Sequence, residues 1–186
     1  MRTTLLLSLA VALLAASCKK DDPAAGLPPA TQVGANTGGC LINGERFVAT
    51  GWDSGSVLSN PVPPLSGGFS FDSVYILRLY GQYLGQHTTV MLFFRAQRTG
   101  SFPLNRNTLY YPQGDPSYIL NHATFSQANS GGELYGTDAQ HTGQIICTQA
   151  DVNRGLSAGT FEFTAASTFD PGKTITITSG RFDRQQ

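Results

Sequence analysis

Apolar and polar residues alternate along most of this chain, and two segments near its N-terminus depart from that alternation. The first segment, residues 3–17, carries no charge and is rich in leucine and alanine. The second is a Pro- and Gly-rich stretch that ends at Gly38 and contains no aromatic residue. From residue 39 onward the pattern has a period of two, which predicts strands rather than helices.

The alternation divides this remainder into short strands separated by turn residues. Asn43-Gly44 lies between two apolar runs, and this dipeptide strongly favours a β-hairpin because both residues tolerate positive φ. The run at 88–97 is partly apolar on both faces, so we expect a central strand there. Strands are expected at residues 40–42, 45–48, 73–80, 88–97, 100–104, 108–111, 118–125, 143–149, 159–165 and 173–178, with long loops at 57–68 and 127–142.

This pattern indicates an all-β domain. Several short strands with Gly, Pro and Asn turns between them are typical of an antiparallel β-sandwich, which we predict, with a β-barrel as the alternative. The Pro- and Gly-rich stretch cannot bury enough apolar surface to offset the entropy of ordering it. The predicted organisation is a leader over residues 1–17, a flexible tether over 18–38 and a single β domain over 39–186.

The leader has the layout of a secretory signal peptide. Arg2 gives it a positive start, an apolar run follows, and Ala15, Ala16 and Ser17 close it with small side chains. The uncharged run is shorter than the roughly 20 residues that a membrane-spanning helix needs. A buried core helix is the alternative, but such a helix would carry polar residues on one face. The layout therefore predicts export and removal of the leader.

The residues around the predicted cleavage site resemble a bacterial lipobox. Leu14-Ala15-Ala16-Ser17-Cys18 ends in the cysteine that this motif requires, although the motif prefers Leu at the place of Ala15. The resemblance implies that Cys18 is acylated, and two or more acyl chains hold a protein stably on a membrane. The lipid on Cys18 would make the membrane a partner of this chain. An ordinary secreted protein with a cysteine at the cleavage site is the alternative.

Two further short motifs resemble features of exported Bacteroidota proteins. Residues 19–22, Lys-Lys-Asp-Asp, resemble the charged tag of surface-exposed lipoproteins. This resemblance implies an outer-membrane lipoprotein that is exposed at the cell surface, with the periplasmic face as the alternative. Asp72-Ser73-Val74 resembles the acceptor triplet for O-glycans, with Ser73 as the acceptor.

A longer series of motifs resembles an uncharacterised family of small Bacteroidota cell-surface lipoproteins. The motifs are CLINGE at 40–45, GSFPL at 100–104, GQIICT at 143–148, SAGTFEF at 157–163 and ITSGRFD at 177–183. The resemblance covers nearly the whole chain after the leader. Because its motifs consist of turn and strand residues, it implies a shared β fold and carries over no functional residue.

Two cysteines remain beyond the one assigned to lipid. Outside the cytoplasm a pair of spare cysteines usually oxidises, so we predict a disulfide between Cys40 and Cys147. A bridge that closes so long a loop contributes roughly 2–4 kcal/mol to stability. Two buried thiols that never meet are the alternative, because cysteine is among the most buried residue types.

The composition argues against nucleic acid as a partner and gives little sign of catalysis. Basic and acidic residues number 12 each, only 13% of the chain is charged, and no cluster of Lys and Arg stands out. Metalloprotease, P-loop and nucleophile-elbow motifs are missing, and His87, His122 and His141 are isolated in the sequence. We therefore predict no catalytic residue, metal or cofactor, while a hydrolase whose site assembles in space stays open.

Aromatic residues near strand ends give the most specific hypothesis about function. Exposed Trp and Tyr faces stack on sugar rings and also serve protein interfaces. Tyrosines that close the core and turn their hydroxyls to water are the alternative. The candidates for a glycan or protein ligand are Trp52, Tyr80, Tyr83, Tyr110 and Tyr111. We predict a non-catalytic binding or surface module, with a secreted hydrolase or a purely structural envelope component as alternatives.

Overall fold

The computed structural model describes residues 24–53, 55, 60–70, 74–95, 98–105, 121–128, 131 and 133–186. These residues form eleven strands that pair antiparallel, so the predicted all-β antiparallel fold is confirmed over the described ranges. Among the same residues there is no helix with the length and apolar character that crossing a membrane requires.

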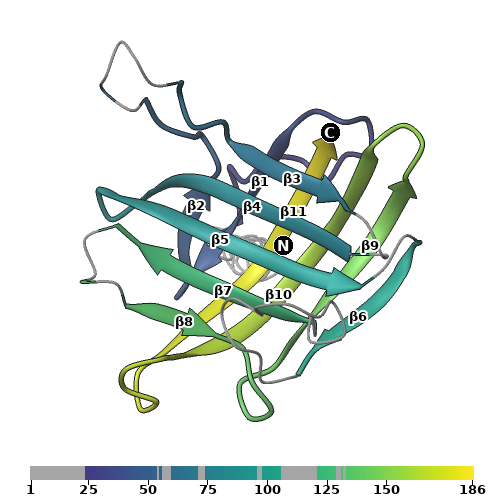
Figure 1. Ribbon diagram of the computed structural model, residues 1–186. Helices are drawn as coiled ribbons and strands as arrows, with labels where there is room; N and C mark the ends of the chain where they lie inside the picture. Colours follow the sequence, from purple (N-terminus) through teal and green to yellow (C-terminus); the bar gives the residue numbers. More distant parts are fainter. Residues whose placement is uncertain are drawn as a thin grey trace, which may run out of the picture.

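All of these strands belong to one hydrogen-bonded sheet rather than to two separate ones. The main path through the sheet runs β2-β1-β11-β10-β8-β7-β5-β4-β3, and β9 and β6 continue from β10 as a second branch. The sheet curls into a half-barrel in which β4, β5 and β7 cross in front of β10 and β11 (Figure 1). The strands are β1 (Thr37–Ile42), β2 (Glu45–Val48), β3 (Leu65–Phe69), β4 (Val74–Tyr83), β5 (Gln86–Arg95), β6 (Gly100–Leu104), β7 (His122–Gln127), β8 (Leu134–Gly136), β9 (Gly143–Asp151), β10 (Leu156–Ser167) and β11 (Thr174–Gln185).

Strand β10 joins the two branches because they share one of its edges. Residues 156–163 of this edge pair with β9, whereas Ala166 and Ser167 pair with β8. On its other edge β10 pairs with β11 over residues 156–166. The β10–β11 hairpin is therefore the common wall of both halves of the curled sheet.

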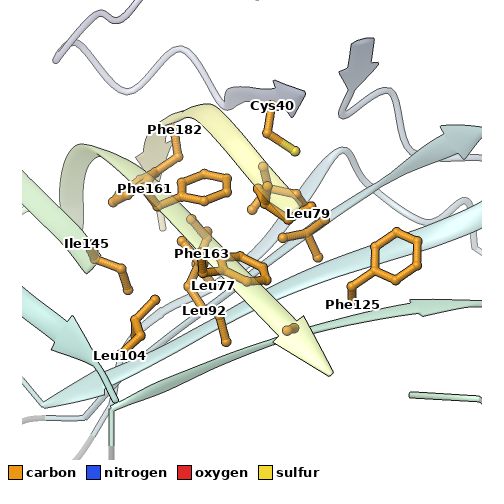
Figure 2. Close-up of a cluster of buried hydrophobic side chains, with 14 of the residues drawn as sticks. Cys40, Leu77, Leu79, Leu92, Leu104, Phe125, Ile145, Phe161, Phe163 and Phe182 are labelled. Atoms are coloured by element: carbon orange, nitrogen blue, oxygen red, sulfur yellow. The ribbon is translucent and has the colours of Figure 1, made fainter. Parts of the chain in front are cut away.

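The concave side of the sheet encloses one hydrophobic core to which both branches contribute (Figure 2). Tyr75 is fully buried there and packs against Phe94 and Phe182, while its hydroxyl lies 2.5 Å from the Ser157 hydroxyl. Burial of each large apolar side chain contributes roughly 1.5–3 kcal/mol, and this burial holds the curl. Other fully buried side chains are Phe47, Leu77, Leu79, Leu92, Leu104, Ile145 and Ile177.

A glycine allows the edge of β2 to reach the opposite half of the sheet. Ala49, directly after β2, forms an isolated bridge with Gly81 in β4. A Cβ atom at Gly81 would lie 2.5 Å from the Val48 carbonyl oxygen and 2.9 Å from the Phe47 ring, so no side chain fits there. The close approach partly closes the curl at this edge.

The predicted flexible tether over 18–38 is corrected for its described part. Residues 24–36, which we call the strap, pack against the outer face of β1, and β1 itself begins at Thr37. Leu27 is buried beside Gly39, where a Cβ atom would lie 3.3 Å from the Leu27 side chain. The Thr31 hydroxyl and the Gly34 amide donate hydrogen bonds of 2.5 and 2.7 Å to the buried Asp183 carboxylate. The strap is therefore part of the β domain.

The predicted disulfide between Cys40 and Cys147 is wrong, because both are free, buried thiols. Cys40 lies on β1 and Cys147 on β9, with β11 and β10 between them in the sheet. Three inter-strand steps of ~4.8 Å amount to roughly 14 Å, whereas a disulfide requires Cα atoms less than about 7 Å apart. The alternative of two thiols that do not meet is the one observed. Burial raises the pKa of Cys147 to about 11 and also raises the pKa of Cys40.

Candidate functional site

A cavity opens at the end of the half-barrel where the β1–β2, β4–β5 and β10–β11 turns converge. We call it the mouth cavity, and its volume is about 380 Å³. Sites for small molecules in proteins measure roughly 300–1,000 Å³, so a small ligand fits. The lining residues are Ile42, Asn43, Tyr83, Leu84, Phe125, Gln127, Glu133, Tyr135, Lys173, Thr174 and Ile175.

Aromatic rings form the inner wall of the mouth cavity. Phe125 on β7 packs edge to face against Tyr83, with ring centroids 6.4 Å apart, and against Tyr135, with centroids 5.8 Å apart. Tyr83 is buried and donates a 3.1 Å hydrogen bond from its hydroxyl to the Ile42 carbonyl. Tyr83 therefore closes the core, as the alternative interpretation of the tyrosines expects, but its hydroxyl binds a backbone carbonyl instead of turning to water. It is not an exposed stacking surface. Tyr135 is half-buried beside Phe125.

Polar groups line the mouth cavity beside these rings. The Glu133 carboxylate accepts a 2.7 Å hydrogen bond from the Ser167 hydroxyl and lies 3.9 Å from the exposed Lys173 ammonium. The Gln127 amide donates a 3.2 Å hydrogen bond to the Tyr83 carbonyl. Burial, reinforced by the Glu133 carboxylate, raises the pKa of Tyr135, so its phenol stays protonated at neutral pH. Carboxylate, amide and ammonium groups thus lie beside aromatic rings in one small space.

Two of the predicted aromatic candidates come together elsewhere, on the outer face of β4 and β5. The Trp52 ring stacks on His87, with centroids 4.5 Å apart and planes 4° apart, and meets the Tyr80 ring edge-on at 5.4 Å. All three side chains are half-buried. His87, which is isolated in the sequence, has one face of Trp52 as its neighbour. This cluster is a compact aromatic surface, and its three residues are not among those that line the mouth cavity.

Several predicted site residues lie outside the described residues. They are the lipid-anchor candidate Cys18, the O-glycan candidate Ser73, and the ligand-binding candidates Tyr110 and Tyr111. The leader over 1–17 and the strand expected at 108–111 lie there as well. These assignments stay predictions.

Comparison with known proteins adds nothing to the geometry. No family model, curated protein or solved structure matches this chain. The mouth cavity must therefore be interpreted from its own chemistry.

Glu133 is the one carboxylate among its described lining residues, whereas glycoside cleavage generally uses two carboxylates roughly 5–10 Å apart. Within the described ranges no group of three or more His, Cys, Asp or Glu side chains is placed to hold a metal ion.

Sequence reasoning missed the polar side of the mouth cavity. Glu133 and Tyr135 belong to or adjoin β8, which lies inside the long loop predicted at 127–142. Lys173 lies in the β10–β11 turn, where a lysine is an ordinary solvent-exposed residue. The one available signal was the apolar pair Leu134-Tyr135 in an otherwise polar segment.

Proposed function

We propose that this protein is a lipid-anchored envelope lipoprotein whose β domain binds carbohydrate, without catalysis, in the mouth cavity. The observation that supports the binding role is the meeting of the half-buried Tyr135 ring with Glu133, Gln127 and Lys173 in one cavity. A sugar ring has an apolar C–H face and a rim of hydroxyl groups. The Tyr135 ring matches the face, while carboxylate, amide and ammonium groups accept from or donate to the hydroxyls.

The binding role has a direct test in the mouth cavity. We expect the exported chain to bind a glycan on a glycan array. We expect Glu133→Gln to weaken that binding about tenfold or more, because a hydrogen bond to a charged group contributes roughly 1.5–3 kcal/mol. We also expect Tyr135→Ala to weaken it, because this variant loses the ring that matches the apolar face of the sugar. Trp52→Ala on the outer face serves as the control. Loss of binding in Trp52→Ala, with the cavity variants unaffected, would move the site to the aromatic cluster and refute the proposal.

The anchoring role rests on the lipobox and on the charged tag at residues 19–22. Both motifs favour the outer membrane, with the domain at the cell surface and the periplasmic face as the alternative. Metabolic labelling with radioactive palmitate in a bacterial host tests it. We expect label on the unaltered chain and none on Cys18→Ala. An unlabelled chain that keeps its leader would overturn this part of the proposal.

A further inference from the structure

We infer that the mouth end of the half-barrel docks on the lipid surface to which the chain is anchored, with Leu84 and Phe169 entering the headgroup region. The anchor at Cys18 is taken from the proposed function, on which this docking surface rests. The partner is the surface of a phospholipid bilayer. Docking turns the mouth cavity toward this surface, so the carbohydrate of the proposed function would be one that lipid headgroups carry. Three separate features of the described residues point to this end of the molecule: exposed apolar side chains, a strained turn and the position of the strap.

Two large apolar side chains project from the turns of the mouth end. Leu84 in the β4–β5 turn is 77% exposed, and Phe169 in the β10–β11 turn is 71% exposed. Leu84 lines the mouth cavity together with Lys173, which belongs to the same turn as Phe169. Both turns therefore border one cavity. Leu and Phe are residues by which proteins that lie on membranes enter the boundary between headgroups and acyl chains.

The backbone at Leu84 is unfavourable for a leucine. Its φ is +51°, and the φ of the next residue, Gly85, is +75°. Hairpin turns with two positive φ values favour Asn-Gly, which the chain uses in its β1–β2 turn at Asn43-Gly44. A leucine that is both strained and exposed contributes little to folding, so its presence points to a role in contact with a partner.

The strap holds the start of the described chain beside the β1–β2 hairpin. Residues 24–27 form a tight turn, in which the Leu27 amide donates a 3.1 Å hydrogen bond to the Ala24 carbonyl. The Arg46 guanidinium donates a 3.0 Å hydrogen bond to the Ala25 carbonyl. Arg46 pairs with Leu41, next to the β1–β2 turn that borders the mouth cavity. The described chain therefore begins beside a hairpin that ends at the mouth.

The chain between strap and anchor is short. Cys18 precedes Ala24 by six residues, and six residues span at most roughly 21 Å when fully extended. The strap does not extend this reach because Asp183 and Arg46 hold it on the domain. Two inserted side chains bind a bilayer weakly by themselves. The covalent anchor keeps them beside the bilayer at a high effective concentration, so weak binding is sufficient.

Quenching of tryptophan by brominated lipids tests this docking surface. The full lipidated chain is placed in phosphatidylcholine vesicles with brominated acyl chains, as Leu84→Trp, Phe169→Trp or Val33→Trp in a Trp52→Phe background. Val33 is the matched control, because it is 75% exposed but lies in the strap beside Asp183, at the opposite end of β11 from Phe169. We expect emission at 84 and 169 to fall about twofold relative to vesicles without bromine, with no change at 33.

Equal quenching at all three positions, quenching at position 33 alone, or no quenching at 84 and 169 would each overturn the docking surface. Flotation of the protein with the vesicles reports the anchor separately. A chain that does not float refutes lipidation at Cys18, whereas a chain that floats without quenching at 84 and 169 refutes only the docking. Since all three positions are exposed, unchanged thermal unfolding confirms that each variant is folded.

Discussion

Asp183 holds the strap on the β domain, and its replacement tests how the N-terminal part of the domain is stabilised. The Asp183 side chain is only 1% exposed. It accepts hydrogen bonds of 2.5 Å from the Thr31 hydroxyl, 3.1 Å from the Val33 amide and 2.7 Å from the Gly34 amide. Asp183→Ala removes every acceptor at once and leaves these donors without a partner in a buried place.

The loss of stability in Asp183→Ala is limited because the strap can detach from the domain. Each hydrogen bond to a charged group contributes roughly 1.5–3 kcal/mol, but the strap can detach and expose its donors to water. The loss therefore cannot exceed the free energy of docking the strap. Breaking a buried charged network typically costs about 3–5 kcal/mol, and we expect Asp183→Ala to lower the free energy of unfolding by about 3 kcal/mol. Asp183→Asn keeps one acceptor oxygen, so its free energy of unfolding should lie between those of the wild type and Asp183→Ala.

The pKa of Asp183 fixes the pH dependence of the same contact. Burial by itself raises this pKa, but hydrogen bonds from Thr31 and from the Gly34, Val33 and Ala35 amides outweigh burial and hold the pKa below its ordinary value. A carboxylate with a lowered pKa in the folded state stabilises fully above the unfolded-state pKa of about 3.9. That stabilisation is lost as the pH falls below this value toward the folded pKa. The strap should stay docked at neutral pH and loosen only in acid.

Hydrogen–deuterium exchange at residues 31–35 measures the docking directly, and urea unfolding measures the total stability. We expect fast exchange of the Val33 and Gly34 amides in Asp183→Ala, with unchanged protection in β4 and β5. Asp138→Ala is the matched control, because that carboxylate accepts from the nearby Gln140 and His141 amides within its own turn. Wild-type protection at Val33 and Gly34 in Asp183→Ala, with an unchanged unfolding free energy, would refute the reasoning.

Two further predictions concern a strained turn and the buried thiols. Leu84→Asn should raise the free energy of unfolding by about 1 kcal/mol in urea, because Asn tolerates the +51° φ that strains leucine; a loss of stability would contradict strain at this turn. Cys40 and Cys147 should react with a thiol reagent at pH 8 far more slowly than an exposed cysteine, because burial raises the pKa of both thiols. Rapid modification of either cysteine in the folded protein would disprove its burial.

The fold class was predictable because a strand with one buried face must alternate apolar and polar residues. A prediction based on alternation stops where the alternation is interrupted, and for this reason two predicted strands end too early. The sequence predicts strands at 159–165 and 173–178, whereas β10 and β11 continue to Ser167 and Gln185. In β10 the alternation breaks at the end of the strand, where Ala165, Ala166 and Ser167 are buried in succession. In β11 it breaks after residue 178, where the pairing with β10 shifts register and Ser179 has a positive φ. An irregular pairing of this kind has no signature in a single sequence.

Strands β3 and β8 could not be predicted from local pattern. β3 contains Ser66, Gly67 and Gly68, residues with little preference for strands, and exists because β4 pairs with it. β8 has only three residues and is fixed by β7 and β10. Because β8 positions Tyr135 in the mouth cavity, the candidate site was missed for the same reason as the strand.

The disulfide prediction failed for a different physical reason. The prediction used the expected export and the even number of spare cysteines, which indicate whether thiols can oxidise but not whether they lie close together. Whether Cys40 and Cys147 can react depends on the order of strands in the sheet, which places β10 and β11 between them. The strap was missed because its composition is that of a linker. Its docking depends on Asp183, about 150 residues further along the chain.

The pairing of the first strand with the last has a consequence for biogenesis. Because β1 pairs with β11, a chain that emerges from its N-terminus exposes one unpaired edge of β1 until its final residues arrive. Phe182 and Ile177 of the core also arrive at that late stage. A polypeptide of this topology cannot complete its sheet until the residues of β11 have been synthesised.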